Sequence, residues 1–175
     1  VESVTAADWV GGLKDQWVAD FIDAYPALAG FAGLIGDTAF TRGGDANIGM
    51  MTKDDISGDL QVDLIGHLNV LDAPWVSTVP QFAALAPAVN AALGGAALQI
   101  SEIAKVIIDG DVTYAYGFKA TPTGFVGADG SSHSGLYSVI IPGDPNTEDV
   151  PEPASVLGLV ALGGLAIATK RKSLA

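Results

Sequence analysis

The first stretch of the chain places apolar side chains every three or four residues, which is the pattern of an amphipathic helix. These side chains are Trp9, Val10, Leu13, Trp17, Val18, Phe21 and Ile22. Thr5 and Asp8 have the spacing of a capping box, with Asp in place of the usual Glu. Pro26 is expected to end this helix, and residues 27–35 to form a second, shorter one. We expect the apolar stripe to lie in the core; the alternative is an exposed aromatic surface for a partner or a glycan.

Alternation of apolar and polar residues indicates strands in later parts of the chain. Residues 60–71 begin with such an alternation and predict one strand. Residues 112–118 and 135–141 predict two more. Asp109-Gly110 lies between apolar runs and favours a two-residue hairpin turn of type I′.

Two segments have weaker patterns. Residues 41–58 are rich in Gly and Asp and predict a loop, whereas residues 79–98 are rich in Ala and predict a helix. We expect Pro87 and Gly94-Gly95 to interrupt that helix. Helices at the front and strands at the back predict an α+β fold, in which N-terminal amphipathic helices pack on a small antiparallel sheet. A single hydrophobic helix is expected to follow at the C-terminus.

The C-terminal end begins with Pro151-Glu152-Pro153, where the prolines remove backbone donors and keep the chain extended. Residues 154–169 then contain no charge. A helix of this length would span roughly 24 Å, which is short of the roughly 30 Å of a hydrocarbon core. The basic residues beyond it could reach the interface, or the bilayer could thin locally. The alternative is a short helix buried in the core.

Lys170, Arg171 and Lys172 follow the apolar run. Such a cluster is expected to stay in the cytoplasm, which places residues 1–149 outside the membrane. The Pro-Glu-Pro sequence, the apolar run and the basic end together resemble the PEP-CTERM sorting signal of Gram-negative bacteria, in a version that looks cyanobacterial. The resemblance implies an exosortase as a transient partner, which would cut near Pro-Glu-Pro. It also implies an inner-membrane anchor through residues 154–169 before processing, and then release to the cell surface or the extracellular matrix, where such proteins accompany exopolysaccharide.

These features predict three parts of the chain. Residues 1–142 are expected to form an exported globular domain, residues 143–153 a linker with the Pro-Glu-Pro motif, and residues 154–175 a hydrophobic sorting or transmembrane helix with a basic end. The chain begins with Val1 rather than Met, which we interpret as the removal of a signal peptide. It has no cysteine, so disulfides and thiol chemistry are excluded.

Residues 1–149, called the body below, are strongly acidic. The body has five basic and 19 acidic residues, which gives a net charge of −14. This charge argues against nucleic acid and against an anionic membrane surface as partners. It favours cations or basic partners instead.

Motifs for catalysis are not found in the sequence. It contains no G-x-S-x-G, no H-E-x-x-H and no Gly-rich phosphate loop. His67, in an apparent strand, and His133, in a Ser-rich loop, are interpreted as structural residues. Trp75 follows a proline and suits either an exposed aromatic or a core position.

The strongest candidates for a metal site are Asp54, Asp55, Asp59 and Asp63. Several hard oxygen ligands within ten residues, around a glycine, could bind Ca²⁺. The spacing does not follow the EF-hand loop, and the alternative is a solvated Asp-rich turn. No other cofactor is expected. Paired carboxylates would also suit glycoside hydrolysis.

Three functions are compatible with these observations. The leading hypothesis is a non-catalytic structural protein of the cell surface, the matrix or a biofilm, which assembles with itself or with exopolysaccharide. The first alternative is a secreted module that binds calcium or a glycan. The second is a secreted hydrolase that acts on glycans or peptides.

Overall fold

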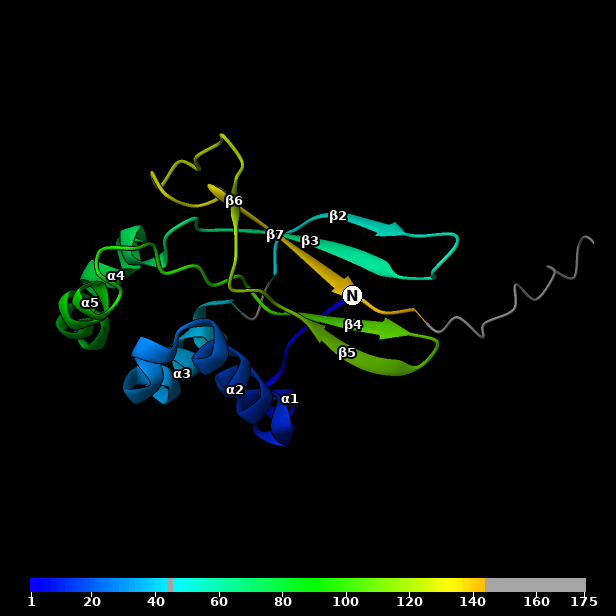
Figure 1. Cartoon of the computed structure of the whole chain (residues 1–175), viewed down its shortest axis with the longest axis horizontal. Helices are drawn as coiled ribbons and strands as arrows, with labels where there is room; N and C mark the ends of the chain where they lie inside the picture. The colour runs from blue at the N-terminus through cyan, green and yellow to red at the C-terminus, as the bar shows by residue number, and fades with distance from the viewer. Residues whose placement is uncertain (44–45, 144–175) are drawn as a thin grey trace, which may run out of the picture. The chain divides into compact units, whose positions relative to one another are not determined.

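The computed structural model describes residues 1–43 and 46–143, whose helices and strands are drawn in Figure 1. Its helical elements are α1 (Ala6–Asp8), the π-type turn η1 (Trp9–Leu13), α2 (Lys14–Ala24), the 3₁₀ helices η2 (Pro26–Phe31) and η3 (Val70–Asp72), α3 (Ala32–Gly43), α4 (Pro74–Thr78) and α5 (Pro80–Ala92). Its strands are β1 (Glu2–Ser3), β2 (Ile48–Lys53), β3 (Leu60–Gly66), β4 (Ala104–Ile108), β5 (Asp111–Ala115), β6 (Thr121–Pro122) and β7 (Gly135–Ile141).

The N-terminal helix begins at the predicted capping box. The Asp8 backbone N–H donates to the Thr5 hydroxyl at 3.3 Å, and the Thr5 N–H donates to the Asp8 carboxylate at 2.8 Å. The helical path then widens through η1, where Gly12 has a φ of 122°. This conformation favours glycine.

The predicted apolar stripe forms the centre of the helical core. Trp17 is fully buried, and Trp9 is 5% exposed. Gly36 of α3 lies so close that a Cβ there would be 3.3 Å from the Trp17 ring. Val10 is the exception, because the π-type turn directs it to solvent and leaves it 81% exposed. The core position predicted for the two tryptophans is confirmed.

The bounds predicted for the second helix, residues 27–35, are wrong, because η2 and the start of α3 share this segment. Pro26 opens the 3₁₀ turn η2, since its fixed φ suits a first helical position. α3 begins later and continues further along the chain. Its extension brings Phe40 to stack on Trp9, with the ring centroids 5.1 Å apart. Packing between distant residues therefore sets the limits of α3.

One sheet has the strand order β2-β3-β7-β6, and its paired strands are antiparallel. β3 pairs with β7 along its whole length. The strand predicted over residues 60–71 is therefore confirmed at its start but ends at Gly66. Beyond it, the Asn69 side chain accepts the backbone N–H groups of Leu71 and Leu98, which turns the chain into η3.

β2 corrects the loop predicted over residues 41–58. It pairs with β3, with a bulge between Ile48 and Met50, and all of its residues are exposed. A strand at the edge of a sheet, exposed along its whole length, has no buried face to impose alternation. The usual sequence signal for a strand is therefore missing here.

The other sheet has the order β1-β4-β5, again with antiparallel pairs. β4 and β5 are joined through Asp109 and Gly110, whose φ angles are 54° and 97°. Positive φ at both positions is the requirement of a type I′ turn, so the predicted hairpin is confirmed. β5 ends at Ala115, earlier than the predicted residue 118.

The Ala-rich segment forms α5, which ends shortly before Gly94 and Gly95 as predicted. Pro87, however, lies inside α5 and does not end it. Phe82 and Val89 are buried on either side of this proline. We attribute the continuous helix to their packing, which offsets the missing hydrogen bond.

Three apolar clusters hold the described residues together. The largest lies among the helices and the segment that precedes β4. The second joins the two sheets through Val62 and Leu64 of β3, Val106 of β4 and Tyr137 of β7. The third is small and surrounds Phe82. The α+β class is confirmed, with two antiparallel sheets where one was predicted.

No helix within residues 1–43 and 46–143 is long and apolar enough to cross a membrane. The hydrophobic helix predicted over residues 154–175 lies outside the described residues, as does most of the linker.

Candidate functional site

The predicted metal ligands lie around the turn between β2 and β3. Asp54 Oδ1 accepts the backbone N–H groups of Ile56 and Ser57, each at 2.8 Å. These hydrogen bonds, chiefly that from Ser57, lower the pKa of the Asp54 carboxyl. Asp54 therefore closes the turn with its own side chain, and Asp55 beside it is exposed.

Asp59 and Asp63 have structural partners of their own. Asp59 Oδ1 accepts the Gly143 backbone N–H at 2.9 Å. Asp63 is buried in β3, where its Oδ1 accepts the Gln61 side-chain amide at 2.9 Å and the Ser138 hydroxyl at 2.7 Å. Within the described part of the chain, no group of three or more His, Asp or Glu side chains could hold a metal ion. The geometry thus adds no support to the calcium prediction.

The Ser-rich loop before β7 brings Asp129, Ser132 and His133 together. The Ser132 hydroxyl donates to Asp129 Oδ1 at 2.7 Å, and His133 Nδ1 lies 3.0 Å from the same hydroxyl. Hydrogen bonds from Ser132 and Ser131 lower the pKa of Asp129 to about 2. In a catalytic triad the carboxylate orients the histidine, but here it accepts the serine hydrogen itself. The hydrogen bonds that Asp129 accepts from Ser131 and Ser132 thus stabilise the conformation of this loop.

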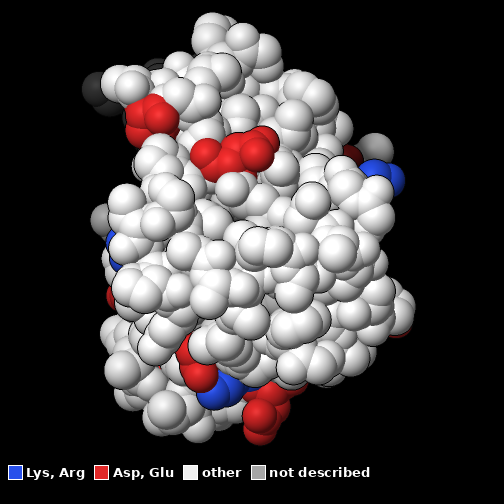
Figure 2. All heavy atoms as spheres, turned by 90° about the vertical axis from the view of Figure 1, so that its left-hand side faces the viewer, with Lys and Arg blue, Asp and Glu red and all other residues white. Residues whose placement is uncertain are grey.

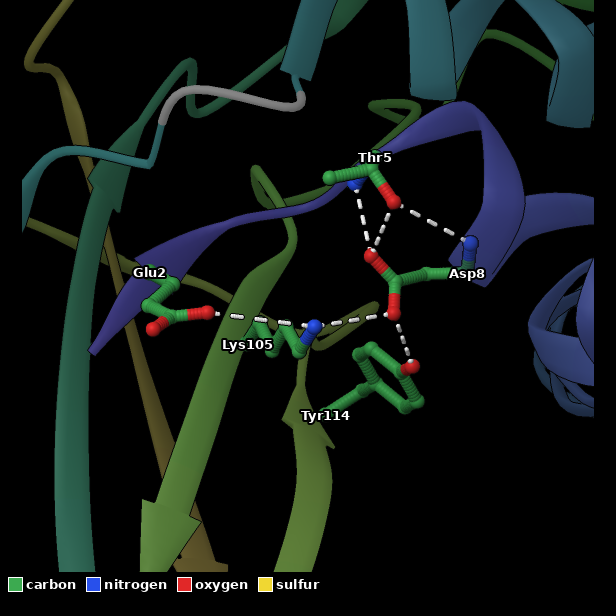
Figure 3. Close-up of polar contacts among 5 residues, drawn as sticks. All are labelled: Glu2, Thr5, Asp8, Lys105 and Tyr114. Atoms are coloured by element: carbon green, nitrogen blue, oxygen red, sulfur yellow. Dashed lines mark hydrogen bonds and ion pairs between the residues drawn. The ribbon is translucent and has the colours of Figure 1, made fainter.

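A polar cluster, formed by Glu2, Thr5, Asp8, Lys105 and Tyr114, ties the N-terminus to the β4–β5 hairpin (Figure 3). Lys105 Nζ lies 3.1 Å from Asp8 and 3.8 Å from Glu2. The Tyr114 hydroxyl donates to Asp8 Oδ1 at 2.9 Å, the same oxygen that pairs with Lys105. These partners, with Thr5 first among them, hold the pKa of Asp8 well below its usual range.

We expect Asp8→Asn to lower the melting temperature of the body at neutral pH, because it removes an ion pair and half of the capping box. A carboxyl whose pKa is lowered by folding stabilises the folded state above its ordinary pKa of 3.8. That stabilisation is lost as the pH falls from there through the lowered pKa. Thermal unfolding from pH 7 down to pH 2 should therefore show the two proteins converging in acid.

Asp23→Asn, at an exposed position of α2, is the matched control for the lost charge. It should leave the melting temperature nearly unchanged at every pH. An Asp8→Asn protein as stable as the wild type at pH 7 would contradict a stabilising role of the cluster.

The described part of the body also contains a half-enclosed pocket of about 70 Å³. Its apolar walls include Ile35 of α3, Trp75 of α4 and Phe82 of α5. Arg42 and His67 are among its polar lining residues, and the Arg42 guanidinium carbon lies 5.6 Å from the centre of the Trp75 ring. The lining residues come from segments far apart in the sequence; of those singled out from the sequence, His67 and the half-buried Trp75 lie here.

The side of the body that carries α4 and α5 has few charges. Residues 73–101 contain no Asp, Glu, Lys or Arg. Figure 2, which views the side where Figure 1 places these helices, shows an uncharged middle with acidic residues above and below it. Arg42, which lies beside this uncharged surface, is therefore a positive charge with few other charges near it.

Comparison with known proteins identifies the C-terminal end. The PEP-CTERM protein-sorting motif matches residues 149–172, which include Pro151-Glu152-Pro153 and the basic cluster that ends at Lys172. The chain therefore carries the sorting signal of an exported protein that an exosortase recognises. The body belongs to no recognised family, and no curated protein and no solved structure matches the chain. The motif itself lies outside the described residues.

Proposed function

We propose that this exported protein is a non-catalytic component of the cell surface or extracellular matrix, whose body associates with further copies of itself. The sorting motif supports the location. The exposed edge strand β2 is the observation that supports self-association.

β2 ends its sheet, and among the described strands it pairs with β3 alone. Its other edge therefore offers backbone N–H and C=O groups that a further strand can bind. Three apolar side chains project from it: Ile48 is 37%, Met50 57% and Met51 41% exposed. Edge strands of proteins that remain monomeric are usually shielded by charges, a bulge or a covering segment. β2 has a bulge between Ile48 and Met50 and a lysine at its end, yet its three apolar side chains stay exposed.

Charge favours the same surface. The body carries −14, so two copies repel each other over most of their surfaces. β2 has no acidic residue, and its only charged side chain is that of Lys53. Two copies can therefore approach along β2 without bringing carboxylates of that strand together.

We expect residues 1–149 to form species larger than a monomer, and Met50→Glu to weaken their association by about tenfold or more, equivalent to about 1.4 kcal/mol. The new carboxylate would meet a second acidic chain at the edge. Analytical ultracentrifugation over a hundredfold concentration range, roughly the span needed to move a weak equilibrium, measures the effect.

Val10→Glu is the matched control, since it adds the same charge at a residue that is 81% exposed on η1. It should leave the association unchanged. A wild-type protein that stays monomeric at every concentration would defeat the proposal, and so would equal effects of the two substitutions.

A secreted binding module is the second candidate function. The half-enclosed pocket beside Trp75 favours it, because a concave apolar site with a few polar groups is the usual form of a small-molecule site.

A further inference from the structure

The pocket beside Trp75 has an apolar interior. Ile35 and Ala39 of α3 face it from one element, Leu98 from the segment before β4, and Phe82 from α5. The Trp75 and Phe82 rings meet edge to face, with centroids 5.3 Å apart. This packing fixes the shape of the wall, so the space is preformed rather than opened by a ligand.

Arg42 gives this apolar space a positive charge. Lys14 and Lys105 are held in ion pairs, with Asp37 and with Asp8 and Glu2 respectively. Arg42 forms no ion pair with any residue that the structure describes, and it contacts the face of Trp75. A guanidinium placed over an aromatic face can still bind a carboxylate through the N–H groups along its edge.

The volume limits the size of the ligand. An apolar cavity of roughly 150 Å³ is known to hold benzene, and the cavity of about 70 Å³ here is about half that size. It therefore accepts a short branched alkyl group, whereas an aromatic ring or a sugar would have to remain partly outside. Its apolar walls would gain by replacing water with such a group.

Glu102 also lines the pocket, where its charge opposes an anion. Its carboxylate accepts the backbone N–H of Asn47 at 2.5 Å and the Asn47 side-chain amide at 3.1 Å. The Glu102 carboxylate is therefore hydrogen-bonded to Asn47, which partly offsets its repulsion of an anion in the pocket. Ser101 Oγ likewise donates to a backbone carbonyl and accepts the Gly117 N–H.

We propose that this pocket binds a small carboxylate with a short branched alkyl body, the alkyl group against Trp75 and Phe82 and the carboxylate on Arg42. The ligand is either a free short-chain acid or the carboxyl-terminal residue of a peptide. This site is independent of the edge of β2, so either proposal can fail alone.

The test uses residues 1–149, which contain the whole compact unit and its apolar clusters. Titration by NMR compares 3-methylbutanoate with 3-methylbutanamide, which has the same alkyl group and no charge. We expect saturable binding of the acid, centred on the indole signal of Trp75, and binding of the amide weaker by about tenfold, the scale of one charge-assisted hydrogen bond. The tripeptide Gly-Gly-Val distinguishes the two sources: tighter binding than the free acid indicates a peptide terminus, and weaker binding a free acid.

Arg42→Gln should reduce the affinity for the acid to that for the amide, without changing the affinity for the amide. Lys53→Gln, which removes the same charge from β2 outside this pocket, should change neither. Ala39→Leu fills the cavity and should abolish both, and thermal unfolding verifies that each variant is folded. Equal affinity for acid and amide, no loss in Arg42→Gln, or no saturable binding by the wild type would each overturn the proposal.

Discussion

Trp17→Ala is expected to destabilise the body by about 3–5 kcal/mol, the usual cost of removing a large aromatic side chain from a core. Trp17 is fully buried, stacks on Phe21 at 5.1 Å and meets the edge of Phe118 at 5.2 Å. Its removal would leave a cavity between α2 and the segment that follows β5. Urea unfolding of residues 1–149, followed by circular dichroism, measures the change.

Trp17→Phe serves as the conservative variant. The Trp17 Nε1 is buried and has no hydrogen-bond partner in the described structure, so phenylalanine removes volume without breaking a bond. It should cost clearly less than alanine, and the exposed Val10→Ala should change stability by less than about 0.5 kcal/mol. A Trp17→Ala protein destabilised by only about 1 kcal/mol, the average for any substitution, would show that the core is not built around this residue.

Replacing Pro151, Glu152 and Pro153 together with alanine is expected to prevent release of the body in the native host. The three residues lie in the matched sorting motif, and alanines would let the apolar segment extend as a helix through the cutting region. Mass spectrometry should find wild-type protein at the cell exterior with a carboxyl end near Glu152. The variant should keep the residues that follow position 153, including the basic residues 170–172, and fractionate with membranes.

Pro145→Ala changes a linker proline outside the matched motif and is the control for altered chain stiffness. It should be cut as the wild type is. Wild-type protein recovered outside the cell with peptides that end at Ala175 would contradict cleavage.

The elements that the sequence predicted well are those whose signal is local. The capping box at Thr5 depends on four consecutive residues, and the turn at Asp109-Gly110 on two. The stripe around Trp17 follows from helical geometry alone. In each of these elements the residues in contact are close together in the sequence, so the sequence pattern is enough to predict the structure.

The elements that were missed depend on distant contacts. β2 is a strand because β3 lies beside it, and its own residues lack alternation. α3 continues beyond residue 35 because Phe40, on its later turns, stacks on Trp9. The pocket is assembled from Ile35, Trp75 and Leu98, which no spacing rule connects. Asp63 was predicted as a metal ligand because its hydrogen-bond partner, Ser138, is distant in the sequence and lies beside it only in the folded sheet.

The place of β7 has a consequence for the order in which an exported chain can fold. β7 lies between β3 and β6, yet it is the last of the described strands in the sequence, so it emerges after the others when the chain is exported from its N-terminal side. The helices and the β1-β4-β5 sheet can form earlier. Until β7 emerges, Val62 and Leu64 lack the packing contact that Tyr137 provides in the folded protein. During that interval β3 exposes the edge that β7 covers in the folded protein, and such an edge favours aggregation. The sorting motif follows β7 in the chain, so a membrane anchor there would give β7 time to pair with β3 before the body is released.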